Sequence, residues 1–437
     1  MLSRRLFLER AGLAAGLGLL NRSLFARKIP SLAAPFAAAG SSTNNALLDH
    51  ARTLLQNAPL IDTHNDLPSM LIDTGGDLTK FDLSKVQPTL CADIPRMREG
   101  CLGVQYWSVY VDSSLQKDHR ALHESLREFD VTLRMIHAYP EAFEQARTAD
   151  DIERIYKSGK IACLIGVEGG HMMENSLAVL RVFYELGARY MTLTHWDNID
   201  WADSATDRPE HRGLTAYGKQ VVREMNRVGM FVDLSHVSAE TMRDALGVTR
   251  APVIFSHSSS FAMNPHPRNV PDDVLRQLPA NGGVCHVNFI KEFISPKNVA
   301  WQDQRSAALR DFHLHLDSDQ AIEQAMKDWE KKNPYPMPTI ADVANHIDHI
   351  REVAGIDHIG IGADYYSAKP DDMAEGLGDV TRYPYLFAEL LSRKYSDDDV
   401  MKIAGRNHLR AMRQMEKVAA DLQKKEPPIV GEGAEKK

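Results

Sequence analysis

The sequence lacks several features that would place it in a specialised class of protein. Only 4 of its 437 residues are cysteine, which is too few for a disulfide scaffold. The chain has 51 Lys and Arg residues against 59 Asp and Glu residues, and this net charge of -8 does not indicate binding to nucleic acid. No internal repeat is evident beyond the alternation of strands and helices described below. These absences leave an ordinary globular chain, and its 43% hydrophobic and 25% charged residues agree with that class. Its length allows one large domain or two smaller ones.

The N-terminus has the pattern of an export signal. Arg4 and Arg5 precede the apolar run Ala11–Leu20, which is too short to span a bilayer as a helix. We expect residues 1–26 to be a twin-arginine signal peptide, with delivery to the periplasm or the medium. The alternative is a chance arginine pair before an N-terminal helix. No cysteine follows the run, so a lipoprotein anchor is not expected. Because the run is too short to span a bilayer, no transmembrane anchor is expected in the mature chain either.

Two further segments have the composition of linkers. Residues 27–45 are rich in Ala, Ser and Pro, and residues 424–437 combine Pro, Gly and charge. We expect a linker in the first and disorder in the second.

The cysteines fall into two pairs. Cys163 and Cys285 lie inside predicted strands and are expected to be buried free thiols. Cys91 and Cys101 could form a disulfide in an oxidising compartment, and this is left open.

Apolar runs alternate with helical patterns along residues 46–423, which we expect to form a single catalytic domain. Helices are predicted between the strands, at Glu124–Ala138, Ser176–Leu186, Ala216–Val228, Ala239–Leu246, Asp272–Leu278 and Ile340–Val353. Eight strands are predicted, at Leu60–Thr63, Val104–Val111, Ala162–Val167, Tyr190–Thr194, Met230–Leu234, Val253–Ser256, Val284–Phe289 and His358–Ile361. Eight strand–helix units predict an α/β fold of the (β/α)8 TIM-barrel type. A doubly wound sheet is the alternative, but it would gather its site at one switch point.

The connection at residues 296–338 is longer than usual and carries Trp301, Trp329 and a proline cluster. It predicts a helical insertion, which is either a lid over the barrel mouth or a surface insertion without a role.

Candidate metal ligands follow successive predicted strands. His64 and Asp66 are two residues apart, so both side chains face one side of a strand. Glu168 ends a buried apolar run, where a carboxylate needs charged partners. His236 and His257 end two further strands. Each residue alone has an ordinary structural explanation, but the five together predict a divalent-metal site in the barrel mouth.

Three other strand-end or loop residues fit around such a centre. His195 is placed to donate a hydrogen bond to a developing oxyanion. Arg268 could bind a carboxylate with two parallel hydrogen bonds. Asp364 could act as a general base or move a proton. The structural alternatives are a core histidine, a surface ion pair and a helix cap.

From about Leu60 to Arg410, the chain resembles the membrane (renal) dipeptidases, peptidase family M19 of the amidohydrolase-like hydrolases. The resemblance rests on motifs in a fixed order: DTHND (62–66), VQYWSVYV (104–111), GVEGG (166–170), LTHWDNIDWADS (193–204), DLSHVS (233–238), VIFSHSS (253–259), RNVPDDVL (268–275), GIGAD (360–364) and GLGDVTRYPYL (376–386).

The resemblance implies a dinuclear zinc centre in which Glu168 bridges the two ions. His64 and Asp66 would complete one site, and His236 and His257 the other. It also implies a homodimer and a dipeptide substrate.

The resemblance gives the remaining residues their roles. A hydroxide bridging the two ions would attack the amide carbonyl of the dipeptide. His195 would stabilise the oxyanion, Arg268 would bind the substrate carboxylate, and Asp364 would be the catalytic acid and base.

The chain departs from the family pattern after the last strand. The usual Asp-Phe-Asp-Gly is replaced by Asp364-Tyr365-Tyr366-Ser367, which leaves the substrate preference open. Rival readings are a hydrolase of the same fold that acts on an N-acyl-D-amino acid, a lactam or a phosphoester, and a non-catalytic periplasmic binding protein. Arg268 argues against a phosphoesterase, and the complete ligand set argues against a binding protein.

Overall fold

The computed structural model describes residues 42–316 and 318–430. The expected signal peptide, most of the expected linker and residues 431–437 therefore lie outside the described part of the chain. Nine strands form one sheet in which every pair is parallel. They are β1 (Leu60–Asn65), β2 (Leu102–Val109), β3 (Phe143–Gln145), β4 (Ile161–Glu168), β5 (Ala188–Thr192), β6 (Phe231–Asp233), β7 (Ile254–Phe255), β8 (Val284–Val287) and β9 (Ile359–Ile361).

The sheet closes into a barrel. Its strand order is β2-β1-β9-β8-β7-β6-β5-β4-β3, and a further pairing joins β2 to β4. This pairing confirms the (β/α)8 fold and excludes the doubly wound alternative. Strand β3 was not predicted. It pairs with the first three residues of β4, whereas β5 pairs with the end of β4 from Ile165 onward.

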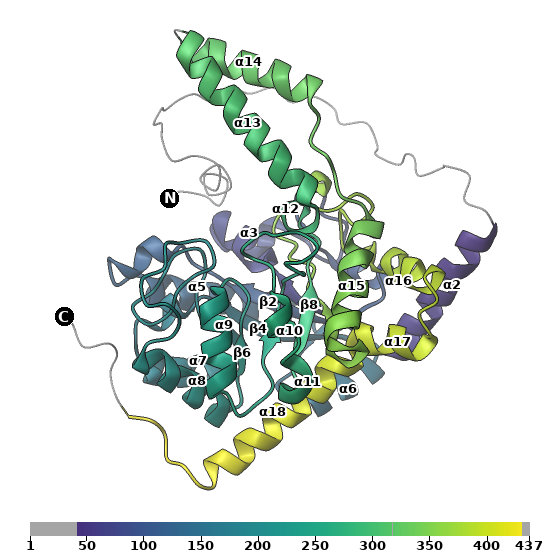
Figure 1. The fold of residues 1–437 in the computed structure, drawn as a ribbon. Helices are drawn as coiled ribbons and strands as arrows, with labels where there is room; N and C mark the ends of the chain where they lie inside the picture. Colours follow the sequence, from purple (N-terminus) through teal and green to yellow (C-terminus); the bar gives the residue numbers. More distant parts are fainter. Residues whose placement is uncertain (1–41, 317, 431–437) are drawn as a thin grey trace. The chain divides into compact units, whose positions relative to one another are not determined.

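Helices lie between successive strands along the chain, and those of residues 48–296 and 337–437 surround the sheet (Figure 1). The α-helices are α2 (Ser42–Asn57), α3 (Leu67–Asp73), α4 (Ile94–Glu99), α5 (Ala121–Ala138), α6 (Ala149–Lys157), α7 (Leu177–Leu186), α8 (Ala216–Val228), α9 (Ala239–Val248), α10 (Asp272–Leu275), α11 (Leu278–Asn281), α12 (Lys291–Ile294), α13 (Pro296–His315), α14 (Asp319–Lys332), α15 (Ile340–Ala354), α16 (Tyr383–Ser392), α17 (Asp397–Met401) and α18 (Asn407–Gln423). None of those described is both long and apolar enough to cross a membrane.

Two local expectations differ from the structure. The helix predicted at Asp272–Leu278 is split into α10 and α11, because Pro279 in the first turn of α11 lacks an N–H and cannot continue the preceding turn. The tail is ordered further than expected. The backbone of Ile429 donates to Glu224 at 3.1 Å and accepts from Arg181 at 3.1 Å, so residues 424–430 pack against the barrel helices.

All four cysteines are free. Cys163 and Cys285 are buried thiols, as expected, and Cys91 and Cys101 do not form the disulfide that the sequence left open.

The barrel interior is packed with strand residues that are fully buried, among them Ile61, Val104 and Leu164. A close approach inside the barrel requires Gly166 on β4. A Cβ atom at that position would lie 1.9 Å from the Tyr190 ring. Only glycine therefore leaves room for the Tyr190 side chain to pass over the backbone of β4.

A polar group lies deeper in the barrel, toward the amino ends of the strands. The Tyr106 hydroxyl and His408 Nε2 are 2.8 Å apart, and His408 Nδ1 is 3.1 Å from His286 Nε2. His286 Nδ1 lies 2.9 Å from the carbonyl oxygen of Phe255. We call Tyr106, His286 and His408 the floor cluster. Every ring nitrogen in it has a hydrogen-bond partner.

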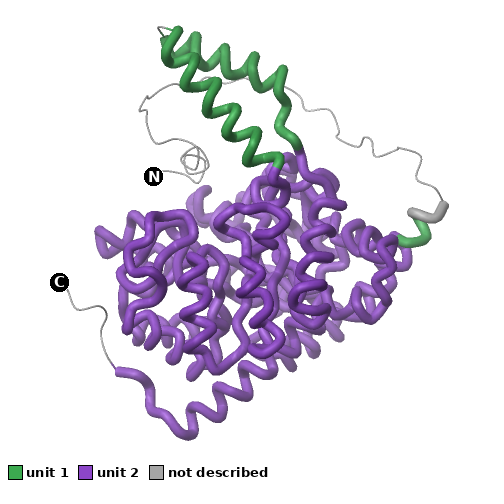
Figure 2. The backbone as a smooth tube through the Cα atoms, viewed as in Figure 1, with its two compact units in different colours: residues 1–47, 297–336 green, residues 48–296, 337–437 purple. Residues whose placement is uncertain are grey.

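The chain divides into two compact units, residues 1–47 with 297–336 and residues 48–296 with 337–437 (Figure 2). Within the first unit, Trp301 of α13 contacts Trp329 of α14 at a ring-centroid distance of 5.7 Å, and its Nε1 donates to the Asn333 carbonyl at 2.8 Å. Arg305 pairs with Glu330 at 2.7 Å. The segment is therefore a helical hairpin, and its function as a lid stays a prediction.

Candidate metal centre

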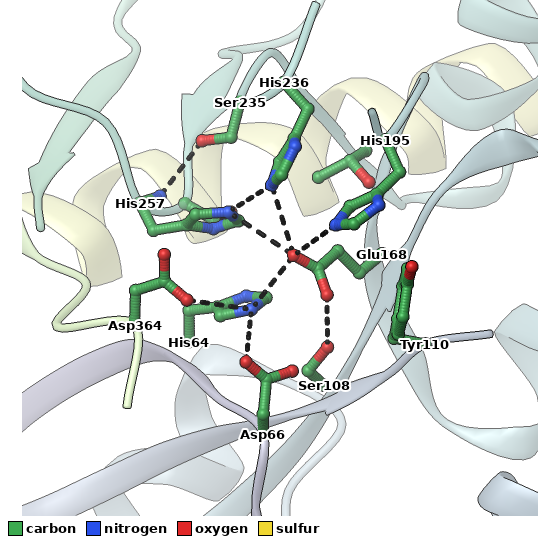
Figure 3. Close-up of polar contacts among 12 residues, drawn as sticks. His64, Asp66, Ser108, Tyr110, Glu168, His195, Ser235, His236, His257 and Asp364 are labelled. Atoms are coloured by element: carbon green, nitrogen blue, oxygen red, sulfur yellow. Dashed lines mark hydrogen bonds and ion pairs between the residues drawn. The ribbon is translucent and has the colours of Figure 1, made fainter. Parts of the chain in front are cut away.

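The predicted ligands lie at the carboxyl ends of the barrel strands. Glu168 is the last residue of β4, and His64 lies within β1, with Asp66 just after it. His236 and His257 follow β6 and β7. All five are at most 3% exposed, and their side chains point toward one another (Figure 3).

Four imidazoles surround a single carboxylate oxygen. Glu168 Oε1 lies 3.4 Å from His64 Nε2, 3.4 Å from His195 Nε2, 3.2 Å from His236 Nε2 and 3.6 Å from His257 Nε2. Two ligand atoms, each about 2.1 Å from one tetrahedral ion, lie about 3.4 Å apart. The spacing of these atoms is therefore that of ligands around metal ions.

Among the residues that the structure describes, buried acid and histidine atoms within 4.8 Å of one another form three groups able to hold an ion. Two of the groups match the predicted sets, namely His64, Asp66 and Glu168, and Glu168, His236 and His257. They share Glu168, which is the arrangement that a bridging carboxylate requires. The third group joins His64 and His257 to Asp364.

The nitrogen atoms of this centre suit a cation. Burial holds the pKa values of His236 and His257 well below the ordinary value, so both imidazoles are neutral. The next cause is the charge of Arg268 for His236 and the charge of His64 for His257. Metal ligation needs deprotonated nitrogens of this kind, so these residues fit a metal ion. His64 Nε2 is also buried, and it has no hydrogen-bond partner among the described residues.

Glu168 requires positive charge beside it. Burial alone would raise the pKa of this carboxyl, but His64 and His195 hold it well below its ordinary value. Burial would likewise lower the pKa of His64, but Tyr190 and Glu168 raise it well above its usual range. A cation between these groups would take the place of the His64 proton.

The outer nitrogens of two imidazoles have partners that sequence reasoning missed. His64 Nδ1 is 2.8 Å from the Tyr190 hydroxyl, and His257 Nδ1 is 2.7 Å from Ser256 Oγ. Ser108 donates to Glu168 Oε2 at 3.2 Å. The signal that could have found one of them is the adjacency of Ser256 and His257 in the chain.

Arg268 forms a buried cationic site next to the ligands. It is 1% exposed, and its Nη2 donates to the His257 carbonyl at 3.4 Å. Its Nε and Nη1 have no hydrogen-bond partner among the described residues. Its guanidinium carbon lies 5.4 Å from the Phe293 ring centroid and 6.0 Å from that of Trp196. Burial lowers the pKa of Arg268 to about 10, so it stays charged near neutral pH and can accept an anion.

His195 and Asp364 complete the centre. The His195 ring lies 4.3 Å from that of Tyr110. Asp364 Oδ1 is 3.8 Å from His64 Nε2, and burial raises the pKa of Asp364 to about 7. A carboxyl with this pKa can both accept and return a proton near neutral pH.

Two site residues have left-handed backbone conformations, with φ of 69° at His236 and 65° at Asp364. Such conformations cost of order 1–3 kcal/mol and occur where the surrounding structure imposes them. The Asp364 N–H donates to the His64 carbonyl at 3.3 Å, and this bond helps to fix the turn.

A family model described as membrane dipeptidase, peptidase family M19, matches residues 48–426. The chain is also similar to three solved structures of low sequence identity, which show the fold.

One is the probable dipeptidase PvdM from Pseudomonas aeruginosa, with 23% identity, a TM-score of 0.74 and coverage of 86% of this chain and 100% of that chain. Another is the dipeptidase AC, a metallo peptidase, with 23% identity, a TM-score of 0.66 and coverage of 82% and 98%. A third is a metallo peptidase from Rhodobacter sphaeroides liganded with a phosphinate mimic of the dipeptide L-Ala-D-Ala, with 22% identity, a TM-score of 0.66 and coverage of 82% and 99%. The match of the family model over most of the chain shows more than the fold: this chain belongs to the membrane dipeptidase family, peptidase family M19, and is a metal-dependent dipeptidase.

Proposed function

We propose that the protein hydrolyses dipeptides with two zinc ions per chain, bridged by Glu168. His64 and Asp66 complete one site, and His236 and His257 complete the other. The observation that carries the proposal is the convergence of the imidazole Nε2 atoms on Glu168 Oε1 at 3.2–3.6 Å. Zinc, when bound, supplies a lowered pKa for water, so that a hydroxide nucleophile exists near neutral pH.

The side chains around the centre bind and orient the substrate. Arg268 binds the terminal carboxylate through the Nε and Nη1 groups that have no partner within the described chain. His195 donates a hydrogen bond to the carbonyl oxygen as negative charge develops on it. Asp364 accepts the proton of the attacking water and delivers it to the leaving amine.

The position of Arg268 sets which amide is cleaved. A substrate carboxylate held by Arg268, next to the ligand His257, places the last amide of the substrate at the centre, and a dipeptide has no other amide. We propose that a D-residue is accepted at the C-terminal position. The support is the Rhodobacter sphaeroides metallo peptidase, whose ligand mimics L-Ala-D-Ala.

We further propose that the protein acts in the periplasm after twin-arginine export. The support is the Arg4-Arg5 pair followed by a short apolar run. Arg4→Lys with Arg5→Lys should leave the protein in the cytoplasm, because the signal is read by a receptor that recognises more than charge. Unchanged periplasmic delivery on fractionation would contradict this.

The metal and substrate assignments are tested on one purified sample. Protein prepared without chelator should contain close to two zinc equivalents by elemental analysis and should hydrolyse L-Ala-D-Ala. His236→Ala should lose one equivalent and most of the activity. An active sample without metal would refute the proposal. Turnover of N-acyl-D-amino acids without turnover of dipeptides would favour that rival, and two bound ions without any turnover would favour a binding protein.

A further inference from the structure

A hydrogen-bonded relay lies behind one of the candidate ligands, on the side away from Glu168. Asp233 is the last residue of β6 and is fully buried. Its Oδ1 accepts the backbone N–H groups of Ser235 at 3.1 Å and Ser256 at 2.8 Å. Its Oδ2 accepts the Ser256 hydroxyl at 2.5 Å, and the same hydroxyl oxygen lies 2.7 Å from His257 Nδ1.

The order of donors and acceptors in this relay fixes the position of a proton. A carboxylate oxygen only accepts, so the single hydroxyl proton of Ser256 goes to Asp233. Ser256 Oγ can then only accept from His257 Nδ1, which must carry the ring proton. His257 Nε2 is left with a lone pair. This atom lies 2.9 Å from His236 Nε2, from which it can accept in the metal-free chain, and 3.6 Å from Glu168 Oε1.

We propose that Asp233 and Ser256 are positioning residues that hold His257 in the tautomer able to bind the second metal ion. This inference rests on the proposed zinc centre and extends it to residues that do not touch the ion. Partners of this kind typically contribute 10–100-fold to metal affinity.

The relay distinguishes His257 from the other ligand of the same ion. His236 Nδ1 has no hydrogen-bond partner among the described residues. The second site therefore combines one imidazole fixed from behind with one that is not, and its affinity depends on the relay at His257.

Asp233→Asn gives the sharpest test, because the structure dictates the orientation of the new amide. The side that replaces Oδ1 faces two backbone N–H donors and must be the carbonyl oxygen. The NH2 group then faces Ser256, donates to its hydroxyl oxygen, and turns the hydroxyl proton toward His257 Nδ1. The ring proton is forced to Nε2, where it blocks the metal.

We expect Asp233→Asn to weaken the binding of one zinc ion by about 10–100-fold, measured by competition with a chromophoric chelator on metal-free protein. Ser256→Ala should weaken it less, because it removes the acceptor without imposing the wrong tautomer. The double variant should bind that ion more tightly than Asp233→Asn alone, since no hydroxyl remains to donate to His257. If the two residues had a purely structural role, the losses of zinc affinity from the two single substitutions would add up in the double variant.

Asp203→Asn is the matched control. Within the described part of the chain, this buried carboxylate accepts backbone N–H groups alone, those of Glu210, His211 and Gly213. It should retain wild-type zinc affinity. If Asp233→Asn does not fold, the tautomer of His257 is measured in Ser256→Ala instead. The measurement is the ¹⁵N chemical shifts of the His257 ring in the metal-free protein. Wild type should show a proton on Nδ1, and the variant should show a mixture of tautomers.

The outcomes separate the two proposals. Wild-type protein that binds no zinc overturns the proposed centre. Wild-type protein that binds two ions, together with an Asp233→Asn variant of equal affinity or a double variant weaker than Asp233→Asn, overturns the relay alone. An unchanged His257 tautomer in Ser256→Ala also overturns it.

Discussion

Two groups of buried imidazoles lie inside the same barrel and differ in one respect. In the floor cluster the carbonyl of Phe255 can only accept, so His286 Nδ1 carries a proton and its Nε2 accepts from His408. His408 Nε2 then accepts from the Tyr106 hydroxyl, and no nitrogen remains without a partner. At the metal centre, His64 Nε2 is buried and has no hydrogen-bond partner within the described part of the chain.

The comparison teaches what distinguishes a candidate ligand from a core histidine. Burial is the same in both groups, and neutral imidazoles occur in both. The metal centre differs because its nitrogens converge on one carboxylate oxygen, Glu168 Oε1, at 3.2–3.6 Å. Convergence of several imidazoles on one carboxylate oxygen, and not burial, marks the site.

The largest expected effect tests Asp364, which lies beside the metal centre without belonging to either predicted ligand set. Asp364→Asn should lower kcat by about 10²–10⁴-fold, because the amide keeps the shape but cannot accept a proton. The zinc content should stay at the wild-type value by elemental analysis. Loss of one ion would instead make Asp364 a ligand, as the group with His64 and His257 allows.

The next largest effect concerns Arg268, which contacts the ligand His257 and is proposed to bind the substrate carboxylate. Arg268→Ala should lower kcat/KM for a dipeptide by about 30-fold or more, mainly through KM, because the substrate carboxylate loses a buried partner. The matched control is the dipeptide amide, which has no carboxylate and should be hydrolysed equally by both proteins. An equal loss on the amide would mean that the substitution damages the centre itself.

A matched pair of substitutions compares the two groups directly. Tyr190 and Tyr106 stack at a centroid distance of 5.5 Å, and their hydroxyls contact His64 and His408 respectively. Tyr190→Phe should weaken zinc binding by about 10-fold, because the outer nitrogen of a ligand loses its partner. Tyr106→Phe should leave zinc affinity unchanged and lower the free energy of unfolding by about 1 kcal/mol. Equal zinc affinity in the two variants would contradict the distinction between ligand histidines at the metal centre and core histidines in the floor cluster.

The smallest effect is a pH dependence that belongs to the floor cluster. Burial lowers the pKa of His286 to about 4, whereas the unfolded chain has the ordinary value of 6.5. Between these values the unfolded state binds more protons, so stability is complete above pH 6.5 and falls as the pH falls toward 4. In metal-free protein, His286→Gln should flatten this dependence by about 1 kcal/mol per pH unit between pH 5 and 6. Denaturant unfolding at several pH values measures it, and an unchanged slope would contradict the assignment.

The sequence predicted the barrel because its strands are short apolar runs at regular spacing. Strand β3 was not predicted, because Phe143–Gln145 has three residues and only one of them is buried. The residues proposed for the site were found because polar residues that follow apolar runs must meet at one end of a parallel barrel. The structure brings His64, Glu168, His195 and Asp364 within hydrogen-bond or ion-pair reach of the centre.

What the sequence could not predict depends on contacts between distant segments. Tyr190 and His64 are 126 positions apart, and Tyr190 reaches His64 only because Gly166 on β4 has no side chain. The direction of the relay at Ser256 follows from the Asp233 carboxylate, which can only accept the Ser256 hydroxyl proton. Hydrogen-bond direction of this kind exists only in the folded chain.

The left-handed turns at His236 and Asp364 have a consequence for anyone who engineers this protein. At a positive φ, glycine relieves local strain, so a search for greater thermal stability by backbone conformation alone would select glycine at both positions. Each exchange would remove a side chain that the proposed chemistry requires. Thermostability and activity would then be opposed at these two positions, and protection of both should precede any stabilising screen.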